Sequence, residues 1–250
     1  MWKGNTVFNL EQFDVSPQVH KIDIAVGENL RLGKYVERLV AFQLRQQPNI
    51  HVLAENIQIQ KDKITLGELD CLLLKAKHPI HLEIIYKFYL YDADVGKSEI
   101  DHFIGPNRKD ALIEKLIKLK EKQLPLLYSN PCMAYIDRLG LNVGSISQQV
   151  YFKAQLFLPY SNQNIQLETL SNDCVVGFYI TKKELKEFTD CKFYIPVKKN
   201  WLVYPHTNVS WLSFSNFKDI TNDYFKQKFS TLCWVKSRNG GIKKVFLVWW

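Results

Sequence analysis

Ionisable residues interrupt two strongly apolar segments, and this feature restricts the fold more than any other in the sequence. Asp70 lies within Thr65–Leu74, and Glu83 and Lys87 lie within His81–Leu90. Unpaired charged side chains are rarely buried, because taking a charge out of water costs several kcal/mol or more. Two carboxylates and an amine on neighbouring strands can satisfy one another, or the carboxylates can hold a divalent cation. We therefore expect these residues to meet at one site.

The segments around them predict a small unit of helices and strands. Apolar residues recur at helical spacing from Leu30 to Gln47, and Pro48 ends the pattern. Short polar turns between the next three apolar segments indicate an antiparallel meander. On the second strand Glu68 and Asp70 lie two positions apart and share a face. The expected strands and helices are the strands 50–60, 67–75 and 80–91, a helix over 105–123, a short helix over 133–139 and a strand over 150–158.

The remainder of the chain mixes strands with short helices. We place a domain boundary after residue 160, which separates a core at 1–160 from a C-terminal region at 161–250. The fold class is α/β, with a mixed α+β sheet. A short strand at His20–Ala25 and turns at Val15–Pro17 and Val26–Asn29 are expected near the N-terminus. In the C-terminal region we expect extended segments at 175–180, 191–197, 201–205, 208–214, 232–236 and 244–250, and helical ones at 182–188 and 219–229.

Charge is distributed unevenly along the chain. Residues 1–150 hold 19 Lys and Arg against 18 Asp and Glu, whereas residues 151–250 hold 14 against 7. A basic, aromatic-rich region suits a polyanion such as nucleic acid, although lysine is also the ordinary solvating residue of a protein surface. The five cysteines form no C-x-x-C pair, which favours reduced thiols and a cytoplasmic protein. No apolar run reaches membrane-spanning length, so we expect no membrane partner.

Several short motifs occur in a fixed order with the spacing of a known superfamily. The chain resembles the PD-(D/E)xK nucleases, which include restriction endonucleases and RecB-type enzymes, over about Leu30 to Pro159. It is similar, more closely, to a family of uncharacterised bacterial proteins usually assigned to that superfamily. The resemblance implies a restriction-endonuclease-like αβββαβ core. The motifs that carry it are Gly67-Glu-Leu-Asp70, Glu83-x-x-x-Lys-Phe-Tyr-Leu90, Gly105-Pro-Asn107 and Gln123-Leu-Pro-Leu126.

The resemblance also implies a metal centre. Asp70, Glu83 and the backbone carbonyl of Ile84 would ligate Mg²⁺, for which Mn²⁺ is a possible substitute. Glu37 would be an accessory carboxylate from the first helix; the plainer interpretation is an exposed helix glutamate. Gln123 would contact the site from the second helix. A carboxylate-held Mg²⁺ supplies the deprotonated water and the charge neutralisation that phosphodiester hydrolysis requires.

Lys87 would orient the attacking water or stabilise the developing negative charge. The superfamily usually has one residue between the glutamate and the lysine, whereas three residues separate Glu83 from Lys87. On a regular strand that spacing corresponds to about 13 Å between the two Cα atoms, unless a β-bulge shortens it.

Two functions therefore compete. The first is a Mg²⁺-dependent nuclease that hydrolyses DNA or RNA, with a basic C-terminal region that binds the substrate backbone. The second is a catalytically inactive nuclease-fold module that binds nucleic acid or a protein partner. A dimer is compatible with either.

Overall fold

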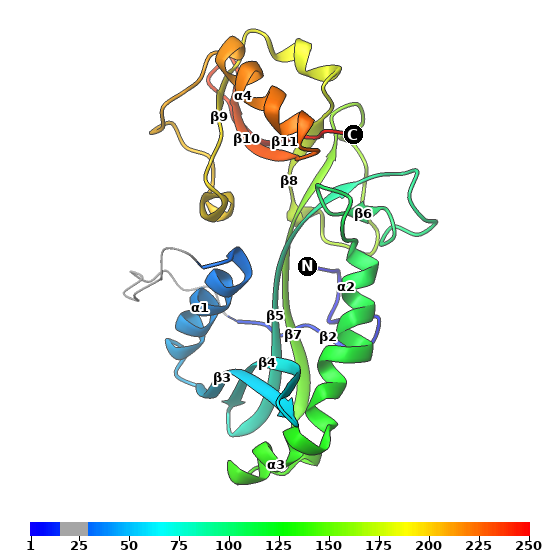
Figure 1. Ribbon diagram of the computed structural model, residues 1–250, viewed down its shortest axis with the longest axis vertical. Coiled ribbons are helices and arrows are strands. Elements are labelled where there is room, and N and C mark those ends of the chain that lie inside the picture. Colours follow the sequence, from blue (N-terminus) through cyan, green and yellow to red (C-terminus); the bar gives the residue numbers. More distant parts are fainter. Residues whose placement is uncertain (16–29) are drawn as a thin grey trace. The chain divides into compact units, whose positions relative to one another are not determined.

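The computed structural model describes residues 1–15 and 30–250 and forms two compact units (Figure 1). The N-terminal unit comprises residues 2–86 and 115–153. The C-terminal unit comprises Met1 with residues 87–114 and 154–250. Beyond Met1, the chain passes between the two units after residues 86, 114 and 153, whereas the sequence predicts one boundary after residue 160. The short strand expected at 20–25 and the turn at 26–29 lie outside the described residues, as does most of the turn at 15–17.

The three-strand meander of the N-terminal unit is confirmed. Its strands pair antiparallel, and each pair is joined by two residues with positive φ, Asp62–Lys63 and Ala76–Lys77. Two such residues form the tight turns that match the twist of antiparallel strands. Pro79, expected in the second turn, instead pairs with Leu74 inside the ladder. The elements are β3 (Ile50–Lys61), β4 (Ile64–Lys75) and β5 (His78–Tyr91), preceded by β1 (Thr6–Val7), β2 (Leu10–Glu11) and α1 (Leu32–Arg45).

A chain of helical segments follows. The helix expected from Gly105 begins only at Leu112, because Gly105–Asp110 forms a turn in which the Gly105 N–H donates to the Asp110 carbonyl. The side chain of Asn107, within this turn, accepts a hydrogen bond from the Ser230 N–H. The segments are α2 (Leu112–Lys118), the π-helical η1 (Leu119–Gln123), the 3₁₀-helical η2 (Leu124–Tyr128), α3 (Asn130–Arg138) and η3 (Val143–Ser145).

The core of the N-terminal unit lies between the meander and these helices. The side chains of Ile57 and Ile59 on β3 and of Leu69 and Leu72 on β4 are buried there, together with Ile136 of α3. The strand order in this unit is β3-β4-β5-β7, where β7 spans Ser147–Pro159. The residues of β5 and β7 are divided between the two units.

The C-terminal unit contains a mixed sheet. Strand β7 pairs parallel with β8, which pairs parallel with β11, and the order continues antiparallel to β10 and β9. Phe217 of α4 stacks on Phe193 of β9, with ring centroids 4.1 Å apart. The elements are β6 (Phe103–Ile104), η4 (Asn172–Cys174), β8 (Val175–Ile180), η5 (Glu184–Phe188), β9 (Lys192–Tyr194), η6 (Lys198–Leu202), α4 (Phe214–Lys226), β10 (Thr231–Lys236) and β11 (Ile242–Leu247).

The predicted fold class, a mixed α+β architecture with a mixed sheet, is confirmed. Two expected extended segments are wrong. Residues 201–205 begin in the 3₁₀ turn η6, where the Trp201 ring is buried, and 208–214 contribute one isolated bridge at Leu212. Both segments have irregular backbone and are rich in aromatic residues. Aromatic residues are common in strands as well, so their β-propensity does not distinguish the two kinds of structure.

Candidate metal centre

The β4–β5 ladder ends where the predicted acidic residues begin. Cys71 and Leu82 form the last pair in the register, so Asp70 lies one step beyond it, opposite Glu83. The Asp70 side chain replaces the missing backbone partner: the Ile84 N–H donates to Asp70 Oδ2 at 2.9 Å. The two strands therefore separate at this point while a side chain still ties them together.

Three carboxylates converge beside this opening. Glu68 and Asp70 share a face of β4, as expected, and Glu37 reaches them from α1. Ligand oxygens of all three lie within 4.8 Å of one another, and all three residues are half-buried. Oxygen ligands at about 2.1 Å around an octahedral Mg²⁺ are separated by about 3 to 4 Å, so this set fits the ion after a small contraction.

Lys34 neutralises part of this acidic cluster. Its ammonium group lies 2.8 Å from Glu37 Oε2, pairs with Glu68, and donates to Asn56 Oδ1 at 2.9 Å. Partial burial lowers the pKa of Lys34, but the hydrogen bonds and charges of the two glutamates outweigh it and raise the pKa above its ordinary value. The Lys34 amine thus supplies positive charge to the carboxylates of Glu37 and Glu68.

Asp70 is the strongly perturbed member of the cluster. Burial, followed by the charge of neighbouring Glu83, raises the pKa of Asp70 to about 8, although the Ile84 hydrogen bond opposes the shift. Without a cation the Asp70 carboxyl therefore keeps its proton at neutral pH. Perturbed carboxyls of this kind are concentrated at functional sites, although structural networks also produce them.

Glu83 is fully buried, and both of its oxygens are hydrogen-bonded. Oε1 lies 3.0 Å from His81 Nε2, and Oε2 accepts from Gln123 Nε2 at 2.6 Å. Gln148 Nε2 lies 3.0 Å from His81 Nδ1, an arrangement that assigns the histidine proton to Nε2, facing Glu83. Lys115 donates to Gln123 Oε1 at 2.6 Å. Glu83 therefore lies in a closed polar network next to Asp70, and its expected metal contact stays a prediction.

The other residues implied by the resemblance have different environments. Gln123 reaches the network from a π-helical turn, a distortion often found at functional sites. Ile84 contacts Asp70 through its N–H; ligation by its carbonyl stays a prediction. Lys87 forms an ion pair with Asp110 at 2.7 Å, and both residues belong to the C-terminal unit. The amine of Lys87 thus already has an acidic partner outside the acidic cluster.

A cavity of about 380 Å³ opens onto the acidic cluster. Gly67 is part of its wall, and a Cβ added there would come within 2.7 Å of a Leu126 methyl group, so glycine lets the Leu126 side chain pack closely against β4. Lys118 and Lys122 are four positions apart on neighbouring helical turns and face the same cavity. Lysines at these positions of a helix are ordinarily solvated, and nothing in the helix pattern distinguishes that role from a place in the cavity wall. The lining residues are Lys34, Leu66, Gly67, Glu68, Asp70, Lys118, Lys122, Gln123 and Leu126.

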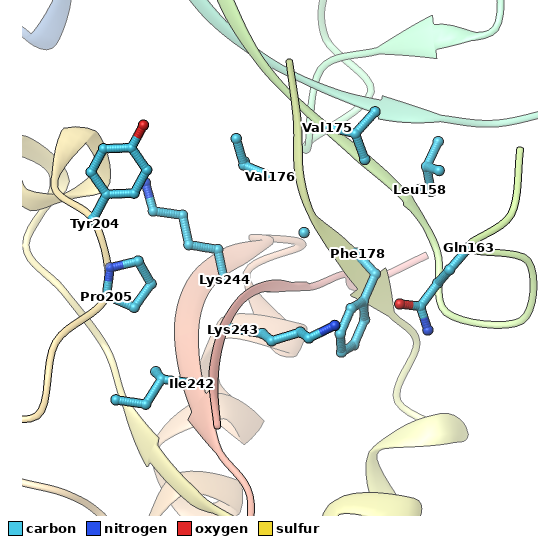
Figure 2. A pocket seen from close by; sticks show the side chains of 11 residues that line it. Leu158, Gln163, Val175, Val176, Phe178, Tyr204, Pro205, Ile242, Lys243 and Lys244 are labelled. Atoms are coloured by element: carbon cyan, nitrogen blue, oxygen red, sulfur yellow. The ribbon is translucent and has the colours of Figure 1, made fainter. Parts of the chain in front are cut away.

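A separate cavity of about 420 Å³ in the C-terminal unit is lined by residues of the paired strands β8 and β11, together with Leu158, Gln163, Tyr204 and Pro205 (Figure 2). Figure 2 shows Lys244 extending toward Tyr204. The Lys244 amine donates to Gln155 Oε1 at 2.8 Å and to the Trp201 carbonyl at 2.7 Å. Burial lowers the pKa of Lys244 to about 8. The described lining contains lysine, tyrosine, glutamine, proline, glycine and apolar residues but no carboxylate, so the acidic cluster is the better candidate for a metal centre.

Within residues 1–15 and 30–250, none of the helices combines the length and hydropathy that crossing a membrane requires. No curated protein and no solved structure matches the chain. A family model described as "Domain of unknown function (DUF1853)" matches residues 5–248, nearly the whole sequence. This match agrees with the expected likeness to an uncharacterised family, while the relationship to PD-(D/E)xK nucleases stays a prediction. The chain belongs to the DUF1853 family.

Proposed function

We propose that this protein is a Mg²⁺-dependent nuclease of the PD-(D/E)xK type whose centre is the acidic cluster Glu37, Glu68 and Asp70. The observation that carries the proposal is the convergence of these carboxylates from a helix and a strand beside a lysine-lined cavity, whose wall includes Glu68 and Asp70. Carboxylate oxygens are the ligands that Mg²⁺ prefers, and Mn²⁺ accepts the same set. When bound there, the cation would supply a nucleophilic hydroxide at neutral pH and neutralise charge on the phosphate.

The protein's own cations bind the phosphate in this proposal. Lys118 and Lys122 line the cavity and carry flexible ammonium groups that can contact a phosphodiester as point charges. This assignment replaces the role that the resemblance gives to Lys87, whose amine pairs with Asp110. Electrostatic stabilisation of this kind is effective in a partly dehydrated cavity, where lysine and phosphate interact more strongly than in open water.

The buried hydrogen-bond network around Glu83 positions the carboxyl group of Asp70, the proposed metal ligand. His81 and Gln123 hold both oxygens of Glu83, and the backbone of Ile84 beside it holds Asp70 Oδ2. Such outer contacts fix the orientation of a metal ligand and commonly affect metal affinity by about 10- to 100-fold. Glu83 therefore acts through Asp70, by fixing its environment and its charge.

A second candidate function is a nucleic-acid-binding module that has lost catalysis. The Lys34 ammonium, which pairs with both Glu37 and Glu68, favours it. If that amine permanently neutralises the acidic cluster, the affinity of the cluster for a divalent cation is low. Phosphate binding by Lys118 and Lys122 would then remain, without hydrolysis.

The test is a cleavage assay on single-stranded, double-stranded and branched DNA and on RNA, with Mg²⁺ or Mn²⁺. We expect metal-dependent cleavage by the wild type, abolished by Asp70→Asn and strongly reduced by Glu68→Gln. Glu121→Gln is the matched control, because Glu121 is exposed on the same helical segment as Gln123 and lies outside the cavity lining. Circular dichroism would establish that each variant folds.

Two results separate the candidate functions. If the wild type leaves every substrate intact with both metals, catalysis is wrong; salt-dependent binding of the same substrates would then support the inactive module, because phosphate contacts release counterions. If cleavage occurs but survives Asp70→Asn, the reaction takes place elsewhere and the acidic cluster is not its centre.

A further inference from the structure

A third cavity, of about 460 Å³, lies in the C-terminal unit between η5 and α4. Its floor is apolar: Leu185 is buried, and Phe214 and Phe225 are half-buried, so each ring is still partly exposed to water. Its rim is basic. The lining residues are Lys182, Lys183, Leu185, Lys186, Thr189, Phe214, Lys218, Asn222 and Phe225.

The rim lysines are available for an anionic partner. All four, Lys182, Lys183, Lys186 and Lys218, are exposed, and none of them takes part in an ion pair within the described part of the chain. Lys182 lies over the Phe225 ring, with its Nζ 5.1 Å from the centroid. The Lys182 amine therefore lies on one face of the Phe225 ring and brings positive charge directly next to the aromatic floor.

We propose that this cavity binds a base of single-stranded nucleic acid, with the flanking phosphates on the rim lysines. The inference names the substrate class of the proposed nuclease and rests on that function only for the choice of a nucleic acid. A nucleobase combines a flat apolar face with a phosphate on either side, which matches an aromatic floor surrounded by lysines. In a duplex the base faces are stacked inside the helix and cannot reach the floor.

An acidic peptide is the competing ligand. It would place its carboxylates on the same rim and an apolar side chain on the floor. The charge of the rim favours the nucleic acid, because all four charged residues of the lining are lysines and a nucleic acid carries a phosphate beside every base.

The experiment measures binding of a fluorescein-labelled oligothymidine by anisotropy in EDTA, so that no metal-dependent cleavage contributes. We expect Phe225→Leu, which keeps apolar volume but removes the aromatic face, to weaken binding by about 5- to 100-fold. We expect Lys182→Gln with Lys186→Gln to weaken binding and to flatten its dependence on salt. Lys192→Gln, an exposed lysine on β9 outside this cavity, is the control and should bind as the wild type does.

Thermal unfolding of Phe225→Leu would separate lost binding from lost folding, and the lysine variants test the same cavity without touching its core. Equal binding of a duplex competitor, unchanged binding by both variants, or preferential binding of a Phe- and Glu-containing peptide would each overturn the inference. Failure here differs from failure of the nuclease proposal. If the protein binds the oligonucleotide but does not cleave it, the nuclease proposal fails and this inference holds. If the protein cleaves DNA but none of these variants changes its binding, this inference fails and the nuclease proposal holds.

Discussion

Gln123 donates a hydrogen bond of 2.6 Å to Oε2 of Glu83, a residue 40 positions earlier in the chain. The bond satisfies one oxygen of a carboxyl group that has no contact with solvent, and His81 satisfies the other. Lys115 in turn holds the Gln123 carbonyl oxygen, so the amide cannot rotate freely. The buried glutamate thus depends on a side chain supplied by a separate helical segment.

The first prediction concerns this bond. Gln123→Leu should lower the free energy of unfolding by about 1 to 3 kcal/mol, because it leaves a buried oxygen of Glu83 without a donor. If Glu83 also orients Asp70, cleavage should fall by about 10- to 100-fold. Urea unfolding and the cleavage assay measure the two effects. Gln163→Leu, an exposed glutamine of the C-terminal unit, is the control, and equal stability of both variants would contradict the prediction.

Strand periodicity was sufficient to predict the meander and the shared face of Glu68 and Asp70. Both follow from local rules: two-residue turns fix the register, and alternation fixes the face. The resemblance, in turn, directed attention to Glu37 and Gln123. Each lies far along the chain from Asp70, and no local pattern indicates their approach to the site.

The sequence could not reveal which lysine side chains lie beside the acidic cluster or in its cavity. Lys34, Lys118 and Lys122 lie on amphipathic helical segments, where lysine is the ordinary solvated residue, and only tertiary packing turns them toward carboxylates or into the cavity. Lys87 looked more informative because it lies inside an apolar strand. Its partner, Asp110, belongs to a turn that the sequence suggested was the start of a helix.

The second prediction tests whether the Lys34 amine takes the place of a metal. Lys34→Met should leave the carboxylates of Glu37 and Glu68 without their shared cation and repelling each other, and added Mg²⁺ should relieve that repulsion. The rise in melting temperature with 10-fold increases in Mg²⁺ should therefore be larger in Lys34→Met than in the wild type. Differential scanning fluorimetry measures it. Lys61→Met, an exposed lysine at the end of β3, is the control, and an identical Mg²⁺ response in all three proteins would rule out competition between amine and metal.

The third prediction distinguishes two assignments of the phosphate-binding cation. Lys87→Gln removes a half-exposed ion pair with Asp110, which is worth about 1 kcal/mol or less. We expect cleavage to change by less than about twofold, whereas Lys118→Gln should raise the KM because it removes a cavity lysine. Steady-state kinetics on one oligonucleotide substrate compares them. A large loss of kcat in Lys87→Gln alone would restore the role that the family resemblance implies.

The fourth prediction follows from the buried amine of Lys244. This residue is only 4% exposed to solvent. Burial lowers the pKa of this amine from 10.5 to about 8, so the unfolded chain binds its proton more tightly than the folded protein does. Between pH 8 and 10.5 the unfolded state holds more protons, and stability must rise with pH. The free energy of unfolding rises by at most about 3 kcal/mol through this group. Below pH 8 the amine is protonated in both states, so the destabilisation caused by its burial no longer changes with pH.

The Lys244→Met variant isolates this contribution from the other groups that titrate in alkali. The free energy of unfolding of the wild type minus that of the variant should increase between pH 7.5 and pH 10, as measured by urea unfolding. Lys243→Met, the neighbouring exposed lysine on the same strand, should show no such increase. A difference that stays flat or decreases over this range would mean that the Lys244 amine remains protonated, held by Gln155 and the Trp201 carbonyl at their observed distances of 2.8 and 2.7 Å.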